Sequence, residues 1–172
     1  SEKATSKIFK IKKRTKKNPL IVHYYNLKML VNDCHINDNF NKLYKKLCPG
    51  PITFVLNLKK GSKISKNVTN NKKTLAVRFP KHLITRKLLK LIEYPLAAPS
   101  ANISTKISPV SKEDVKDEFG KKIKFILDGG QSKIGLESTI ISLIKKPQIL
   151  RLGGIKTSTI NKIFKTNLKL SK

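Results

Sequence analysis

The residues best suited to chemistry in this sequence are short hydroxyl and amide side chains and a few arginines beside predicted strand ends. The segment 95–102 is the most informative: residues 96–98 predict the end of a buried strand, Pro99 ends it, and Ser100 and Asn102 place polar side chains at its mouth. Small neighbours and converging donors and acceptors are typical of a site for a small polar ligand. A plain turn is the alternative, because Pro, Ser and Asn are common turn residues.

Arginine is scarce in this lysine-rich chain, so its four positions are informative. Arg78 lies within the otherwise apolar segment 74–79, which predicts a strand. A guanidinium in such a strand needs a partner, because an unpaired buried charge is very costly. A structural carboxylate could pair with it, but the chain has only 10 Asp+Glu. A ligand carboxylate is therefore a fair candidate.

Other cations and hydroxyls also lie at predicted element ends. Lys12 and Arg14 follow the first predicted helix, where they could hold phosphate or simply form a solvated basic helix end. Ser138 begins another predicted strand, and Arg151 ends one before two glycines that permit close backbone approach. Ligands of open α/β sheets bind at such strand ends. Plain turns and strand edges are the alternative for each position.

The sequence lacks the patterns of several common enzyme classes. No Ser-His-Asp or Cys-His pairing, dinucleotide fingerprint or Walker loop is recognisable. Cations and small hydroxyls instead suit anion positioning and charge stabilisation, as in nucleotidyl transfer. Cys34 and Cys48 have no metal-ligand spacing, so we expect no structural zinc and no disulfide framework, which fits a reducing cytoplasm. No membrane span or signal peptide is expected.

Charge and length limit the remaining possibilities. The 172 residues suffice for one domain with a core. The formal net charge of +28 favours an anionic partner such as nucleic acid or a nucleotide. The lysines run from Lys3 to Lys172 without a separate basic arm. A compositional bias towards lysine is therefore the alternative to a nucleic-acid surface.

The hydrophobic pattern alternates irregularly between helices and strands, which predicts an α/β domain with a mixed sheet. Helices are expected at the start of the chain (through Ala4, Ile8 and Ile11), after a cap at Asp38, after Pro80, after a Ser111–Asp114 capping box, and through Ile160 and Phe164. Strands are expected at 20–24, 52–58, 74–79, 96–98, 123–127, 139–144 and 148–151.

Eight segments in this order resemble the YrdC-type L-threonylcarbamoyladenylate synthases. They are Lys12-Lys13-Arg14 with residues 18–23, Cys48-Pro49-Gly50-Pro51-Ile52-Thr53, residues 74–78, residues 95–102, Ser108-Pro109, Leu127-Asp128-Gly129-Gly130, Gly135 with Glu137-Ser138-Thr139, and Leu150-Arg151 with Gly153-Gly154. The resemblance implies a single α/β domain, a YrdC-like twisted mixed β-sheet with flanking helices, over residues 1–155. A C-terminal helical tail would occupy residues 156–172.

The resemblance also implies a reaction and a site. The family makes threonylcarbamoyl-AMP and pyrophosphate from L-threonine, bicarbonate and ATP, with Mg²⁺. A downstream complex then transfers the threonylcarbamoyl group to adenosine 37 of tRNA. By resemblance, L-threonine would contact His23, Arg78, Ala98 (through its backbone) and Ser138. ATP would contact Lys12, Arg14, Asn18, Thr74, Ser100, Ser108 and Arg151.

This sequence departs from the family pattern in several places. The family's N-terminal strand and its Pro-Thr-Glu-Thr-Tyr-Gly-type motif do not occur, so we expect the domain to be N-terminally incomplete. Lys13 and Thr105 stand where the family usually has glycine, and Thr15 stands where proline is usual. Two alternatives to the synthase are kept: an RNA-binding module of the same fold, and a YrdC-like module of a carbamoyltransferase, which would normally accompany zinc-binding domains.

Overall fold

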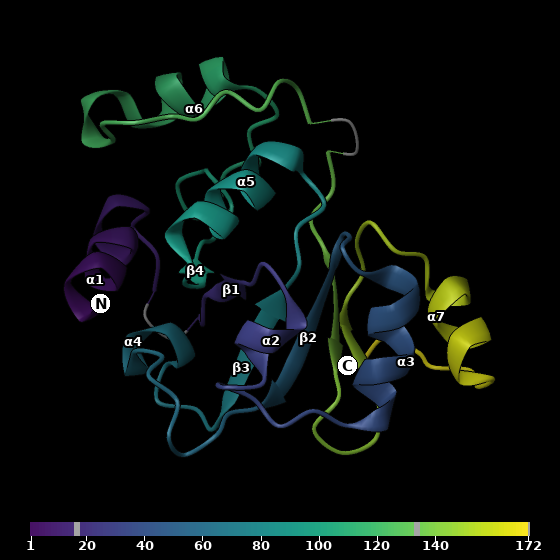
Figure 1. Cartoon of the computed structure of the whole chain (residues 1–172). Helices are drawn as coiled ribbons and strands as arrows, with labels where there is room; N and C mark the ends of the chain where they lie inside the picture. The colour runs from purple at the N-terminus through teal and green to yellow at the C-terminus, as the bar shows by residue number, and fades with distance from the viewer. Residues whose placement is uncertain (16–17, 133–134, 172) are drawn as a thin grey trace.

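A six-stranded mixed sheet with flanking helices forms this α/β domain. The computed structural model describes residues 1–15, 18–132 and 135–171. The strand order is β4-β1-β3-β2-β5-β6. Figure 1 shows α3 and α7 together beside β2, β5 and β6, whereas α5 and α6 lie beyond the end of the sheet that carries β4. The predicted fold class is confirmed.

The strands pair both in parallel and in antiparallel fashion. β1 (Ile21–His23) runs parallel to β3 (Thr74–Arg78), and β2 (Ile52–Asn57) runs antiparallel to β3 and parallel to β5 (Thr139–Ser142). β6 (Gln148–Arg151) closes one edge against β5, and β4 (Leu96–Ala97) closes the other against β1. The C-terminal ends of β1 and β3 and the start of β5 therefore lie at one edge of the sheet, which carries His23, Arg78 and Ser138.

The helices begin mostly at residues whose side chains cap them. Ser1, Asn26, Asn37, Ser65 and Ser111 each accept a hydrogen bond from a backbone N–H of the first turn. The helices are α1 (Glu2–Ile11), α2 (Leu27–Leu30), α3 (Asp38–Leu47), α4 (Lys66–Thr69), α5 (Leu83–Ile92), α6 (Lys112–Phe119), the 3₁₀ turn η1 (Gly120–Lys122) and α7 (Thr157–Phe164). The Ser111–Asp114 capping box is present as predicted.

Aromatic side chains form the centre of the core. Phe40 of α3 packs edge-on against Phe54 of β2 at 5.0 Å between ring centroids, and Tyr44 packs in the same way against Phe79 at 4.8 Å. Ile160 of α7 is fully buried in the same core. The C-terminal helix therefore packs onto the sheet domain, and it contacts α3 directly (Figure 1).

Three local predictions were wrong, and two short helices were missed. Residues 123–127 form no strand, and Phe125 is 89% exposed, because an apolar run becomes a strand only where a neighbouring strand pairs with it. Asn37 rather than Asp38 caps α3. Residues 96–98 are not buried, because β4 is an edge strand. The four-residue helices α2 and α4 were not predicted, since so few residues show no period. No described helix is long and apolar enough to cross a bilayer.

Candidate functional site

The end of α1 sets the direction of two cationic side chains. The N–H of Lys13 donates to the carbonyl of Lys10 at 3.2 Å, and the N–H of Arg14 donates to the carbonyl of Phe9 at 3.0 Å. This pair of bonds is a Schellman motif, which places Lys13 in the left-handed region at φ 51°. The chain therefore leaves the helix sharply, with the buried Phe9 anchoring the turn.

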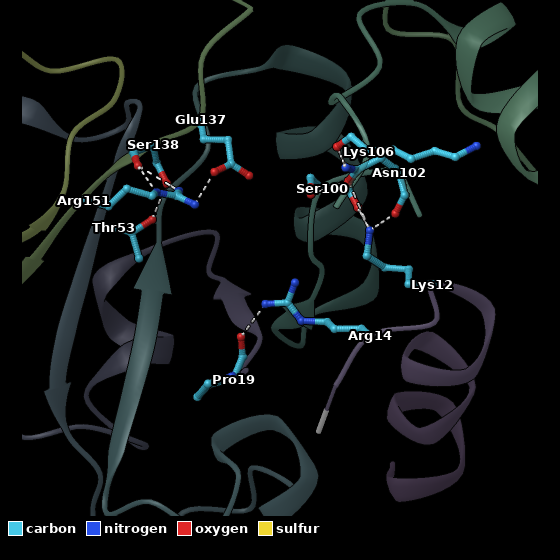
Figure 2. Close-up of polar contacts among 10 residues, drawn as sticks. All are labelled: Lys12, Arg14, Pro19, Thr53, Ser100, Asn102, Lys106, Glu137, Ser138 and Arg151. Carbon is cyan, nitrogen blue, oxygen red and sulfur yellow. Dashed lines mark hydrogen bonds and ion pairs between the residues drawn. The ribbon is translucent and has the colours of Figure 1, made fainter. Parts of the chain in front are cut away.

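Lys12 is buried against the loop that follows β4. Its ammonium donates to the carbonyl oxygens of Ser100 and Asn102, and to Asn102 Oδ1 at 3.3 Å (Figure 2). Ser100 Oγ also lies 2.6 Å from Asn102 Oδ1. A lysine ammonium has three protons, so these three oxygens account for all of them. Lys12 thus fixes the shape of the 100–102 segment.

Arg14 lies between Lys12 and the start of β1. Its Nε donates to the carbonyl of Asn18 at 3.2 Å, and one terminal nitrogen donates to the carbonyl of Pro19 at 3.1 Å. Figure 2 shows the guanidinium between the cluster around Lys12 and the cluster around Arg151. The remaining guanidinium N–H groups have no donor bond to another described side chain, so they are free to face a ligand.

His23 and Arg78 lie opposite each other at the ends of the parallel strands β1 and β3. His23 Nδ1 and Arg78 Nε are both buried, and neither has a hydrogen-bond partner among the described residues. A buried polar atom without a partner is rare in folded proteins, because it forfeits its bond to water. Two such atoms on neighbouring strand ends indicate a place where a ligand completes the bonding.

A second polar cluster surrounds the start of β5. Ser138 Oγ lies 2.7 Å from Thr53 Oγ1, and both hydroxyls are buried. Arg151 donates through Nε and a terminal nitrogen to the Ser138 carbonyl at 3.1 and 2.8 Å, and its other terminal nitrogen pairs with the Glu137 carboxylate (Figure 2). The guanidinium is therefore held in one orientation beside the Ser138 hydroxyl.

Two adjoining cavities collect these side chains. The larger, of about 580 Å³, is lined by Lys12, Arg14, Asn18, Thr74, Ser100, Asn102 and Arg151 among others. The smaller, of about 210 Å³, is lined by His23, Arg78, Ala98, Ser100, Ser108, Ser138 and Arg151 among others. Ile21, Pro99, Ser100, Glu137 and Arg151 line both cavities. The two spaces therefore meet along Ser100 and Arg151.

The electrostatics of the site are dominated by desolvated cations. Burial lowers the pKa of Arg78, and the nearby Arg151 lowers it further. Burial, followed by the charge of Arg78, lowers the pKa of His23 to about 4. His23 is therefore neutral at physiological pH. Burial also lowers the pKa of Lys12 and of Arg14. Such a cluster is stabilised by an anion.

The structure brings together all eleven residues singled out in the sequence, but divides them between the cavities. Ser108, expected beside the nucleotide residues, lines the smaller cavity instead of the larger. Sequence reasoning assigned no ligand contact to Thr53, Glu137 or Asn102. Thr53 and Glu137 gave no separate signal, although Glu137 lies beside Ser138. Asn102 was interpreted with Ser100 as a polar side chain of a candidate ligand site, without a ligand of its own.

The polar groups of the site do not form a metal centre. Among the described residues, no three His, Cys, Asp or Glu side chains come close enough together to hold a metal ion. Glu137 is the single carboxylate lining either cavity. The arrangement can bind a polyphosphate and a carboxylate and stabilise negative charge that develops between them.

The comparisons with known proteins agree with this geometry. The Sua5/YciO/YrdC family model, described as "Telomere recombination", matches residues 1–153. Threonylcarbamoyl-AMP synthase from Pyrococcus abyssi is 43% identical over 95% of this chain and 48% of its own length. The synthase of Schizosaccharomyces pombe is 37% identical over 91% of this chain and 44% of its own length. The chain thus spans about half the length of these relatives.

A solved structure is also similar throughout. The crystal structure of P. abyssi Sua5 complexed with L-threonine superposes with a TM-score of 0.94 and 39% identity, over 99% of this chain and 50% of the other. Nearly the whole of this chain therefore matches about half of a protein that was crystallised with L-threonine.

Proposed function

Because this chain belongs to the Sua5/YciO/YrdC family, we propose that it forms the substrate site of an L-threonylcarbamoyladenylate synthase. The observation that carries the proposal is the unpartnered pair His23 Nδ1 and Arg78 Nε, buried beside a cavity that adjoins a larger cationic one. The smaller cavity suits an amino acid, and the larger one suits a nucleoside triphosphate.

L-Threonine would occupy the smaller cavity. The Arg78 guanidinium would bind the carboxylate, because no described carboxylate forms an ion pair with it. Neutral His23 and the Ser138 hydroxyl would hydrogen-bond the polar groups of the amino acid. The N–H of Ala98 already donates to the Ile21 carbonyl at 3.0 Å, so its backbone contribution would be its carbonyl oxygen. That oxygen would accept from the threonine nitrogen.

ATP would occupy the larger cavity. Arg14 would bind phosphate oxygens through the N–H groups that do not bond to the Asn18 and Pro19 carbonyls. Arg151, which bonds to Ser138 and Glu137 in the ligand-free protein, would contribute its positive charge. Lys12 would act mainly by its charge and by holding the loop, because its protons bond the 100–102 segment. The other proposed contacts to ATP come from Asn18, Thr74 and Ser100 of the larger cavity. Ser108 lines only the smaller cavity, so its proposed contact to ATP would lie where the two cavities meet.

The chemistry joins the two ligands where the cavities meet. The threonine amine takes up carbon dioxide from bicarbonate and becomes a carbamate. A carbamate oxygen attacks the α-phosphorus of ATP, the bond from that phosphorus to the bridging oxygen breaks, and pyrophosphate leaves with the electron pair. Arg151, which lines both cavities, is placed to stabilise the developing negative charge. Mg²⁺ would enter bound to the ATP phosphates, since the described residues supply no cage for it.

The same proposal gives the fate of the product and the cellular compartment of the protein. Threonylcarbamoyl-AMP would pass to a complex that transfers its threonylcarbamoyl group to adenosine 37 of tRNA. The cytoplasm is the compartment we propose, because both cysteines are free thiols, as in reducing compartments.

The direct test is threonine-dependent release of pyrophosphate. Purified protein is supplied with ATP, bicarbonate, Mg²⁺ and L-threonine, and product mass is followed with ¹³C-bicarbonate. We expect pyrophosphate and a product one mass unit heavier than with unlabelled bicarbonate, only when threonine is present. Pyrophosphate release that is indifferent to threonine, or no release at all, would falsify the proposal.

RNA binding is the second candidate function, and the net charge of +28 favours it. A protein that binds RNA through many lysines loses affinity steeply as salt rises, because counterions are released. The discriminating experiment compares RNA affinity in the protein and in its R78A and S138A variants across a salt series. Steep salt dependence with unchanged affinity in both variants would support RNA binding through a surface separate from the cavities.

A further inference from the structure

Among the described residues that line the two cavities, Glu137 carries the only carboxylate, whereas several of the others are cations. The larger cavity carries Lys12, Arg14 and Lys72 as well as Arg151, and the smaller carries Arg78 and Arg151. The charge of Glu137 opposes the lowering of the pKa of Lys12 and of Arg14 that burial causes. Glu137 therefore acts electrostatically on both Lys12 and Arg14, and Glu118 also acts on Lys12.

Arg151 is held on two sides by groups of different kinds. Nε and one terminal nitrogen bind the Ser138 carbonyl, and that same terminal nitrogen lies 3.2 Å from Ser138 Oγ. The other terminal nitrogen binds the Glu137 carboxylate. Ser138 would therefore keep the guanidinium in position even if the carboxylate moved away, which leaves the Glu137 edge available for exchange.

The main chain beneath this pair is tightly fixed. A Cβ on Gly153 would lie 2.3 Å from the Glu137 carbonyl oxygen, so only glycine fits there, and the N–H of Gly154 donates to that same oxygen at 2.9 Å. The Glu137 side chain is less confined than this backbone, because 46% of its surface is exposed. Its carboxylate can turn into solvent without disturbing the backbone that carries Ser138.

We propose that Glu137 is an internal anion that occupies Arg151 in the ligand-free protein and yields it to a phosphate group. The pairing offsets one positive charge of the cluster and orients Arg151 while no ligand is bound. An entering polyphosphate then competes with the carboxylate for the same guanidinium edge. The identity of the anion rests on the proposed function, which releases pyrophosphate.

The experiment is titration of the purified protein with inorganic pyrophosphate in Mg²⁺-free buffer. E137Q keeps the shape of the side chain and removes its charge, so both the competition and the repulsion of phosphate disappear. We expect the dissociation constant for pyrophosphate to fall about three- to tenfold, the range for a half-exposed ion pair. E113Q is the matched control, since it makes the same change in net charge at an exposed α6 residue, and its affinity should stay within about twofold of the unmodified protein.

Thermal unfolding of each variant shows whether it is folded. If E137Q is unstable, E137A replaces it, and we expect E137A also to bind pyrophosphate more tightly than the unmodified protein. Affinity that is unchanged or weaker in both Glu137 variants overturns the inference, because Glu137 would then support the bound phosphate. If the unmodified protein releases pyrophosphate in the reaction but the Glu137 variants show no tightening, only this inference fails. If no variant and no unmodified protein binds pyrophosphate, the phosphate site fails together with the proposed function.

Discussion

His23 and Arg78 are register partners at the ends of β1 and β3, and each buries one nitrogen without a hydrogen-bond partner among the described residues. Both residues also line the smaller cavity, which makes this strand end a candidate binding site. Keeping them desolvated costs stability that a bound ligand restores.

Replacing Arg78 by methionine should therefore stabilise the ligand-free protein. The variant R78M removes a desolvated charge and fills the same volume, so we expect the free energy of unfolding in urea to rise by about 1–2 kcal/mol. Saturating L-threonine should stabilise the unmodified protein and leave R78M unchanged. As a control, R86M should be less stable than the unmodified protein, because Arg86 lies over the Tyr25 ring at 4.7 Å and donates to its carbonyl. A less stable R78M would contradict this account.

The neutral form of His23 should make stability fall in mild acid. Its pKa is about 4 in the folded protein and about 6.5 when unfolded, so the unfolded state binds the extra proton first as pH decreases. The stability contribution is complete above pH 6.5 and is lost between pH 6.5 and 4, amounting to about 3 kcal/mol.

Urea denaturation across that pH range measures the effect. The H23Q variant should lose most of this pH dependence. The H35Q variant changes an exposed histidine and should keep the slope of the unmodified protein. Equal slopes in H23Q and the unmodified protein would show that other groups cause the dependence.

Replacing Lys13 by glycine should make the folded protein more stable. Lys13 has φ 51° in the Schellman motif at the end of α1, a conformation that costs an L-residue about 1 kcal/mol. We expect K13G to raise the free energy of unfolding by about 0.5–1 kcal/mol, whereas K10G within the helix should lower it by about 1 kcal/mol. Destabilisation by K13G would show that the lysine side chain contributes more than the strain costs.

The hydrogen bonds of Lys12 should stabilise the conformation of the 100–106 loop. The variant K12M leaves the buried carbonyl groups of Ser100 and Asn102 unpaired, which should cost about 1–3 kcal/mol. Hydrogen exchange should speed up at the Ser104 amide, which donates to the Lys12 carbonyl at 2.9 Å. K10M, at an exposed position of the same helix, is the control. Unchanged exchange in K12M would mean that the loop holds its shape without the ammonium.

The sequence predicted most of the sheet because its strands have clear apolar runs. Residue type and position indicated Lys12, Arg14, Arg78, Ser100, Ser138 and Arg151 as candidate site residues, and the family resemblance added the other five. It could not show that Lys12 binds a loop 88–90 residues away, since no local pattern encodes such a contact. The Glu137–Arg151 ion pair could not be predicted for the same reason. Residues 123–127 have a strand-like composition, yet composition does not reveal whether a partner strand is present.

The most direct test of the two-cavity site is to measure L-threonine and ATP affinity separately in R78A and R14A. Arg78 lines only the smaller cavity and Arg14 only the larger. We predict that R78A weakens L-threonine binding at least about 50-fold, the loss expected for a charge-assisted bidentate pair, and ATP binding by less than about threefold. R14A should show the opposite pattern. Loss of both ligands in each variant, or of ATP in R78A alone, would contradict the assignment of one ligand to each cavity.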